Sequence, residues 1–173
     1  MNKKYTKRHI FALTATSAMT ALSVVLCRYL GFSAEGTPFR FEIGFLPIAL
    51  VAYMFGPIYS AAGYLVADII GSLLGGYPPN IWISACQIFF GAAMGLFLHK
   101  REPTVIRTTL CFSFIAVFID FLAKSPVFVF LYGWTWGYAL GMRALNALIN
   151  LLIRIFLYYL TLKATKKHLD KLT

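Results

Sequence analysis

The stretch over residues 43–74, IGFLPIALVAYMFGPIYSAAGYLVADIIGSLL, decides the fold because it is almost wholly apolar and contains a single charged side chain, Asp68. A helix crosses the hydrocarbon core of a membrane when about 18 to 20 consecutive residues are apolar. The pair Gly56-Pro57 interrupts the run, since glycine followed by proline favours a turn over a continuous helix. The stretch therefore predicts a short helix over 43–55 and a membrane-spanning helix over 58–74.

Similar apolar runs extend along the whole chain. Of its 173 residues, 60% are hydrophobic and only 13% are charged, which excludes an ordinary water-soluble globule. Four further helices are predicted over 7–29, 80–98, 104–124 and 139–162. The aromatic-rich stretch between the last two is either an interfacial loop or a helix extension. We therefore predict an all-α membrane protein, a bundle of six transmembrane helices that occupies 1–173 as one domain, with no soluble domain.

The basic residues indicate how such a bundle is oriented. Eleven of the 16 lysines and arginines lie in three groups at the ends of apolar segments: Lys3, Lys4, Lys7 and Arg8; Lys100, Arg101 and Arg107; Lys163, Lys166, Lys167 and Lys171. Basic residues concentrate in the short cytoplasmic ends of membrane proteins. We therefore expect both termini in the cytoplasm. Nucleic-acid binding is excluded because no soluble stretch is long enough to carry a basic face.

Two further sequence features are assigned structural roles. No A-x-A-like cleavage site follows the first apolar run, so we expect a transmembrane helix there rather than a cleaved signal. The cysteines Cys27, Cys86 and Cys111 are widely spaced inside apolar segments, which is typical of small buried side chains. We expect neither a cofactor nor a metal site.

Polar residues inside the apolar segments indicate a binding site. An ionisable side chain within a bilayer is costly unless it is paired or hydrated, so each one is a candidate functional residue. Placed by the predicted topology, the candidates gather in the outer half of the bundle: Arg28, Asp68, Asn80, Trp82, Lys124, Arg143 and Asn146. Three of these are cations that oppose the positive-inside trend, which favours a pocket for an anionic solute. In the alternative interpretation the cations extend to the lipid headgroups and Asp68 pairs with one of them. Asp120 and Arg154 lie deeper and are interpreted as helix-packing or partner-contact residues.

The first predicted helix carries a face of small side chains. Thr14, Ser17, Ala18 and Ala21 recur at helical spacing, and small residues allow another helix to approach closely. The face serves either a contact inside the bundle or the docking of another protein.

Several short signatures point to a family. GFLPIAL at 44–50, MFGP at 54–57 and ADIIG at 67–71 are similar, in order and spacing, to signatures of the membrane-embedded S components of energy-coupling factor (ECF) vitamin transporters. LCRYL at 26–30, the segment from YPP at 77–79 to Ser84-Ala85, LYG at 131–133 and Arg143 agree with the same pattern. The resemblance covers nearly the whole chain and is greatest to the folate-specific branch.

The resemblance implies a function and a division of labour. The chain would capture folate with high affinity from outside a bacterial cell, and it would have no ATPase activity of its own. It would dock, through the small face of its first helix, on a transmembrane T subunit driven by two ATPases. Asp68 would accept hydrogen bonds from the pterin edge, and Trp82 or a phenylalanine would stack on its ring. Lys124, Arg143 or Arg28 would pair with the dianionic glutamate tail. Alternatively, Arg28 would stabilise the polar loop predicted over 31–42, with Glu35 or Glu42 as its partner.

Departures from the folate-type pattern leave other readings open. Leu122-Ala123-Lys124 stands where folate-type members have Leu-Asn-Thr, Gly141-Met142-Arg143 replaces Pro-x-Arg, and Asn80 replaces a glycine. The first alternative is therefore a different vitamin or precursor, such as a queuosine precursor or pantothenate. A membrane assembly subunit without a ligand is another alternative. A membrane enzyme is disfavoured because the three histidines of this chain lie at predicted cytoplasmic ends, far from the candidate site in the outer half: His9, His99 and His168.

Overall fold

The computed structural model describes residues 3–29, 43–76, 78–101 and 104–169, and every regular element among them is helical. The elements are α1 (Lys3–Tyr29), α2 (Phe45–Phe55), α3 (Pro57–Leu74), α4 (Ile81–Leu98), α5 (Val105–Phe114), the π-helix η1 (Ile115–Ala123), α6 (Ser125–Tyr132) and α7 (Trp136–Leu169). The predicted all-α fold class is confirmed. The predicted loop over 31–42, including Glu35 and Glu42 as possible partners of Arg28, lies outside the described residues.

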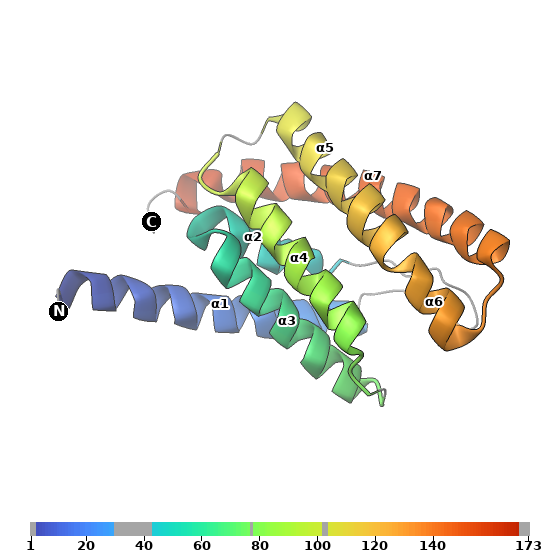
Figure 1. Ribbon diagram of the computed structural model, residues 1–173. Helices are drawn as coiled ribbons and strands as arrows, with labels where there is room; N and C mark the ends of the chain where they lie inside the picture. Colours follow the sequence, from blue (N-terminus) through green and yellow to red (C-terminus); the bar gives the residue numbers. More distant parts are fainter. Residues whose placement is uncertain (1–2, 30–42, 77, 102–103, 170–173) are drawn as a thin grey trace.

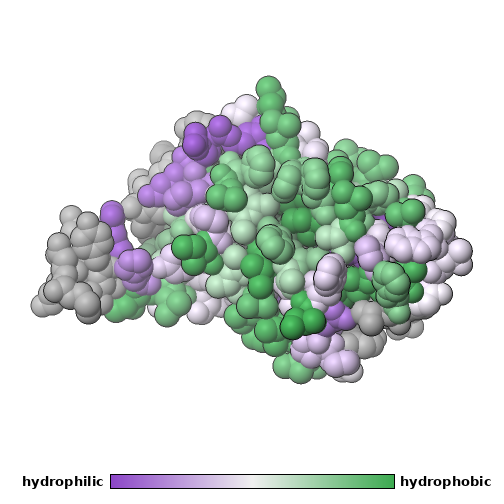
Figure 2. Space-filling model, viewed as in Figure 1, coloured by the Kyte–Doolittle hydropathy of each residue, from purple (hydrophilic) through white to green (hydrophobic). Residues whose placement is uncertain are grey.

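The helices have the length and surface of a membrane protein. Five helical segments of the described chain are long and apolar enough to cross a membrane: Lys7–Tyr29, Pro57–Leu74, Ile81–Leu98, Val105–Phe130 and Trp136–Thr165. The sixth apolar helix, α2, is shorter. Large apolar side chains such as Ile58, Ile81 and Phe130 remain at least 79% exposed, and Figure 2 shows hydrophobic residues over much of the visible face. Helix α1 begins and helix α7 ends at the same end of the bundle (Figure 1).

The predicted break between α2 and α3 is confirmed. Gly56 has a φ of 88°, a backbone conformation that favours glycine, and its N–H bonds to the carbonyl of Ala52 at the end of α2. Pro57 then occupies the first position of α3, where its missing N–H costs no helical hydrogen bond. The chain therefore reverses within two residues, and α2 packs against α3.

Helices α3 and α4 run side by side in close contact (Figure 1). A Cβ atom added at Gly95 would lie 2.2 Å from Cα of Pro57, and one added at Gly91 would lie 2.5 Å from the carbonyl oxygen of Ser60. The Ser60 hydroxyl also donates to the Gly91 carbonyl across the interface, at 2.7 Å. The two backbones therefore touch through glycine, as in other close helix pairs of membrane proteins.

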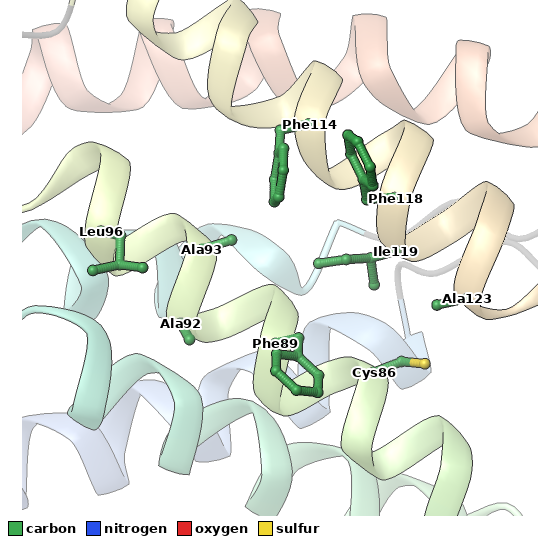
Figure 3. A pocket seen from close by; sticks show the side chains of 9 residues that line it. All are labelled: Cys86, Phe89, Ala92, Ala93, Leu96, Phe114, Phe118, Ile119 and Ala123. Atoms are coloured by element: carbon green, nitrogen blue, oxygen red, sulfur yellow. The ribbon is translucent and has the colours of Figure 1, made fainter.

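A largely apolar groove, here called the α4–η1 groove, lies between α4 on one side and α5 and η1 on the other. Its cavity volume is about 370 Å³. It is lined by Cys86, Phe89, Ala92, Ala93 and Leu96 on one side and by Phe114, Phe118, Ile119 and Ala123 on the other (Figure 3). Among the residues that the structure describes, none of those lining the groove is charged.

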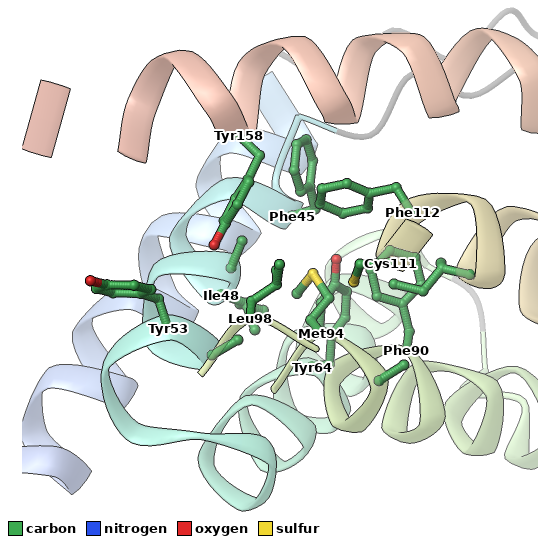
Figure 4. Close-up of a cluster of buried hydrophobic side chains, with 14 of the residues drawn as sticks. Phe45, Ile48, Tyr53, Tyr64, Phe90, Met94, Leu98, Cys111, Phe112 and Tyr158 are labelled. Atoms are coloured by element: carbon green, nitrogen blue, oxygen red, sulfur yellow. The ribbon is translucent and has the colours of Figure 1, made fainter. Parts of the chain in front are cut away.

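The buried core is centred on α2, which contacts α1, α3, α4 and α7. Phe45 meets Phe112 edge to face with ring centroids 5.6 Å apart, and Phe112 meets Tyr158 in the same way at 5.7 Å (Figure 4). These three rings join α2, α5 and α7. Such edge-to-face pairs add stabilisation beyond the burial of area.

The second half of the chain extends the predicted helices. The predicted helix over 104–124 continues through η1 into α6, so the stretch after 124 begins as a helix extension. Gly133, with a φ of 68°, ends α6 in the left-handed conformation. The last helix begins at Trp136, three residues before the predicted start, and continues to Leu169, beyond the predicted end. It packs along α5 and η1 (Figure 1).

Candidate ligand-binding site

Three cations converge on one buried residue, Asp120 of η1. Its carboxylate accepts from Lys124 Nζ at 2.8 Å and from Arg154 Nη1 at 2.5 Å. Its backbone carbonyl accepts from Arg143 Nε at 3.2 Å and Arg143 Nη2 at 2.6 Å. All four residues are at most 7% exposed. We call them the Asp120 cluster; it joins the end of η1 to α7.

The π-helical backbone explains why the Asp120 carbonyl is available to Arg143. In an α-helix, the Lys124 N–H would donate to the carbonyl of residue 120, four positions earlier. Here it donates to the carbonyl of Ile119, at 3.1 Å. The wider turn leaves the Asp120 carbonyl to a side chain from α7. π-Helical turns inside α-helices occur frequently at functional sites for this kind of reason.

Aromatic rings cover the cations of the cluster. The Arg154 guanidinium lies 4.7 Å from the centroid of the Phe90 ring, and Lys124 Nζ lies 5.8 Å from the same centroid. The Arg143 guanidinium lies 4.5 Å from the Phe128 ring. Within about 6 Å, ring faces attract cations electrostatically. The core ring of Phe90 and the α6 ring of Phe128 therefore help to hold the cluster in place.

Trp82 and Asn80 lie at the start of α4, next to the cluster. The Asn80 side chain caps the helix by accepting from the N–H groups of Trp82 and Ile83, at 2.9 and 3.3 Å. Trp82 Nε1 donates to the carbonyl of Ala123 at 2.9 Å, immediately before Lys124. Trp82 as a whole remains 56% exposed. The indole thus bridges α4 and η1 and keeps a face available for stacking.

Asn146 lies on α7 one turn after Arg143. Its side-chain oxygen accepts from Asn150 Nδ2 at 2.6 Å, and its backbone carbonyl accepts from the same nitrogen at 3.0 Å. Asn150 is buried and Asn146 is half-buried. The two amides form a polar ladder on α7 between Arg143 and Arg154.

Arg28 and Asp68 belong to a second set of contacts, between α1, α3 and α4. Asp68 accepts a hydrogen bond from Ser84 Oγ at 2.6 Å, and Arg28 Nη2 donates to the carbonyl of Gly71 at 3.1 Å. The carboxylate that pairs with Lys124 is thus Asp120, not Asp68. The structure brings Lys124, Arg143 and Trp82 together around the end of η1. It places Arg28 and Asp68 in the separate contacts between α1, α3 and α4.

The predicted small face of α1 points away from the bundle. Thr14, Ser17, Ala18 and Ala21 are all exposed. The contact with the bundle is made by another face, with Ala12, Thr16, Thr20 and Ser23 buried, and a Cβ atom added at Gly63 of α3 would lie 3.0 Å from Thr20 Oγ1. The internal helix contact of α1 therefore does not use the predicted face.

Comparisons with known proteins agree with the resemblance. No family model matches the chain. The chain is 30% identical over 106 residues to the folate transporter FolT of Clostridium novyi (strain NT), a match that covers 59% of this chain and 59% of that relative. A crystal structure of FolT bound with folic acid matches with a TM-score of 0.74 and 24% identity, over 83% of this chain and 86% of that chain. This chain has the FolT fold.

The position of Asp120 at the centre of the cluster could not be predicted from the sequence alone. Asp120 and Arg154, which the sequence predicts as helix-packing or partner-contact residues, do join η1 to α7, and they belong to the same cluster as Lys124 and Arg143. One signal was present in the sequence, because Asp120 and Lys124 are four residues apart, and such pairs meet on a helix. The contribution of Arg154 could not be found in this way, since it is 34 residues from Asp120.

Chemically, the Asp120 cluster is suited to an anion. It comprises three cations and one carboxylate among the described residues, in a buried position where electrostatic interactions are stronger than in water. Trp82 and Phe128 supply aromatic surface beside it. A ligand with a negative charge and a flat ring would find both groups at this end of the FolT fold.

Proposed function

We propose that this chain captures folate from outside the cell as the S component of an ECF-type importer of the folate branch. The observation that carries the proposal is the gathering of Lys124, Arg143 and Arg154 on Asp120 within a FolT fold. The 30% identity to a folate transporter supports the same ligand. The chain would act as a binding subunit without catalysis, and energy would come from two ATPases through a T subunit.

In the proposed binding mode, the glutamate tail of folate approaches Lys124 and Arg143 while its ring stacks on Trp82. The exposed indole and the cluster support this arrangement, because Trp82 is bonded to the residue before Lys124. Asn80 and Asn146 would offer amide groups to the polar edges of the ligand, and Asp68 and Arg28 would complete the site from α3 and α1. Aromatic stacking and charge-assisted bonds are the interactions that such a ligand needs.

The proposed topology is six transmembrane passes in a bacterial cell membrane, with both termini in the cytoplasm. It is supported by five helical segments of spanning length, by the additional helix α2, and by the start of α1 and the end of α7, which lie at the same end of the bundle (Figure 1). The site then lies toward the outer surface, at the end where α4 and α7 begin and α3 ends. A cysteine introduced at Lys163 should react with a membrane-impermeant reagent only from the cytoplasmic side.

The ligand is tested by purifying the full-length chain in mild detergent and titrating it with folate. We expect saturable binding by the wild type and a loss of affinity of about tenfold or more for Lys124→Met, since a hydrogen bond to a charged group is worth about 1.5–3 kcal/mol. Lys163→Met is the matched control, because Lys163 is an exposed lysine on α7. Equal affinity for all three proteins would contradict the proposed site. A copurified ligand without a pterin ring, identified by mass spectrometry, would assign the site to another vitamin.

Docking on the T subunit is proposed to use the exposed small face of α1. A tryptophan in place of Ala18 should prevent close approach of a partner helix, so we expect the Ala18→Trp variant to lose most of its assembly with the T and ATPase subunits while it keeps folate binding. Ala164→Trp introduces the same side chain at an exposed position of α7 and is the control. Full assembly of the Ala18→Trp variant, measured by copurification, would rule out this docking face.

A further inference from the structure

The lining of the α4–η1 groove favours a ligand other than folate. The nine described residues that line it are apolar or, in Cys86, weakly polar, so none of them offers a charge to a dianionic ligand. Its rim is exposed on the surface of the bundle, because Phe89, Leu96 and Phe118 are 67%, 72% and 53% exposed. Both walls belong to segments of membrane-spanning length, Ile81–Leu98 and Val105–Phe130. The groove therefore opens toward the hydrocarbon core of the bilayer.

The dimensions of the groove fit a single acyl chain. On α4 it extends from Cys86 to Leu96, which at 1.5 Å per residue is about 15 Å. This length is about half of a hydrocarbon core of about 30 Å, the depth of one leaflet. A partner helix is about 10 Å in diameter with its side chains and needs small residues on both walls to approach closely. The projecting rings of Phe89 and Phe118 instead leave room for a thin, flexible chain.

Basic residues lie at one end of the groove. Arg107, in the first turn of α5, precedes Phe114 by seven residues, or two helical turns, and so shares the face of α5 that lines the groove. Lys100 and Arg101 are exposed and follow the end of α4, close after Leu96 in the chain. The opposite end, at Cys86 and Ala123, approaches the Asp120 cluster. Cations therefore lie at both ends of the apolar groove, with Arg107, Lys100 and Arg101 at one end and the Asp120 cluster at the other.

We propose that the α4–η1 groove is a binding site for an anionic phospholipid. One acyl chain lies along the groove between Phe114 and Leu96, and the phosphate is held by Arg107, with Lys100 and Arg101 nearby. A basic residue near the membrane surface favours an anionic headgroup over a zwitterionic one. The inference rests on the membrane location of the chain and on these residues, and it holds whichever ligand the Asp120 cluster binds.

The experiment compares two lipids with identical acyl chains, phosphatidylglycerol and phosphatidylcholine. The full-length chain in detergent is incubated with each lipid, and bound lipid is measured by native mass spectrometry. We expect one phosphatidylglycerol to be retained in preference to phosphatidylcholine, and we expect Arg107→Gln to reduce that preference by about fivefold. Lys7→Gln, which removes an exposed cation from α1, is the matched control and should leave the preference unchanged.

A second variant separates the acyl chain from the headgroup. Ala93 points into the groove from α4 (Figure 3), so Ala93→Leu should fill it and lower the retention of both lipids, with folate binding unchanged. Equal retention of the two lipids by the wild type, or equal losses in Arg107→Gln and Lys7→Gln, would overturn the proposal. A third result would also overturn it: the wild-type protein retains neither lipid, and the Ala93→Leu variant loses assembly with the partner subunits. That result would assign the groove to a helix of a partner. Arg107→Gln keeps the proposal testable if Ala93→Leu fails to fold.

Discussion

The α1–α4 part and the α5–α7 part of the bundle hold together by different means. Between α3 and α4 the backbones touch at Gly91 and Gly95, and α1 meets α3 at Gly63. From η1 to α7 the contact depends on charge, with Lys124, Arg143 and Arg154 bound to Asp120. Close backbone packing leaves little room for a ligand, whereas a set of cations from separate helices can respond to one. The difference explains why the candidate site lies mainly in the second part.

The largest expected effect comes from removing the centre of the charged part. Asp120→Asn leaves buried cations without their carboxylate, and breaking a buried pair in this way costs about 3–5 kcal/mol of unfolding free energy. The same substitution at Asp68 affects a hydrogen bond from Ser84, which an amide oxygen still accepts, so we expect a loss below about 1 kcal/mol. Thermal unfolding in detergent measures both.

A double variant tests the reason for this loss. Asp120→Asn combined with Arg154→Met removes one cation together with the carboxylate, and it should recover part of the lost stability. If the double variant were less stable than Asp120→Asn alone, Arg154 would be held by packing rather than by its pairing with Asp120.

A smaller but still large effect is expected where backbones touch. Gly95→Ala places a methyl group against Pro57, where neither backbone can move without opening the α3–α4 contact, so we expect a loss of about 3 kcal/mol. Gly71→Ala is the matched control, because a Cβ atom there meets none of the described residues within 4 Å. That variant should be as stable as the wild type or more stable by up to about 1 kcal/mol. Similar melting temperatures for the two variants would show that the close approach does not limit stability.

The smallest effect is expected at the junction of the two parts. Trp82→Phe keeps an aromatic ring but removes the bond to the Ala123 carbonyl, which should cost about 0.5–1 kcal/mol. Folate binding should weaken only slightly, because the ring can still stack. A loss of affinity as large as that expected for Lys124→Met would mean that the indole N–H, rather than the ring, is what the site requires.

Most of the helical plan could be predicted from the sequence because it depends on local chemistry. Long apolar runs identify the spans, and Gly56-Pro57 identifies the reversal between α2 and α3. The boundaries around α6 could not be decided, since Ser125-Pro126 suits both the start of a helix and a loop. The start of α7 at Trp136 could not be decided either, because Trp136 and Tyr138 are suited to the membrane interface in any backbone conformation.

The Asp120 cluster could be predicted only in part. Depth along each helix follows from residue number, and it placed Lys124 and Arg143 near one another correctly. Rotation of each helix about its axis depends on packing, so the sequence did not show that Arg154 reaches Asp120. The π-helical turn could not be predicted either, because a nine-residue segment that is apolar except for Asp120 fits either helical period. It became visible only in the bond from the Lys124 N–H to Ile119.

The length of α7 has a consequence for the membrane itself. Its apolar segment, Trp136–Thr165, has 30 residues and is about 45 Å long, against a hydrocarbon core of about 30 Å. If tilt alone were to place this segment within the hydrocarbon core, the tilt angle would have to approach about 50°. Transmembrane helices are tilted by at most about 40°. The ends of α7 must therefore reach into the headgroup layers, or the surrounding lipids must stretch. This hydrophobic mismatch makes bilayer thickness one of the variables that set the orientation of the protein.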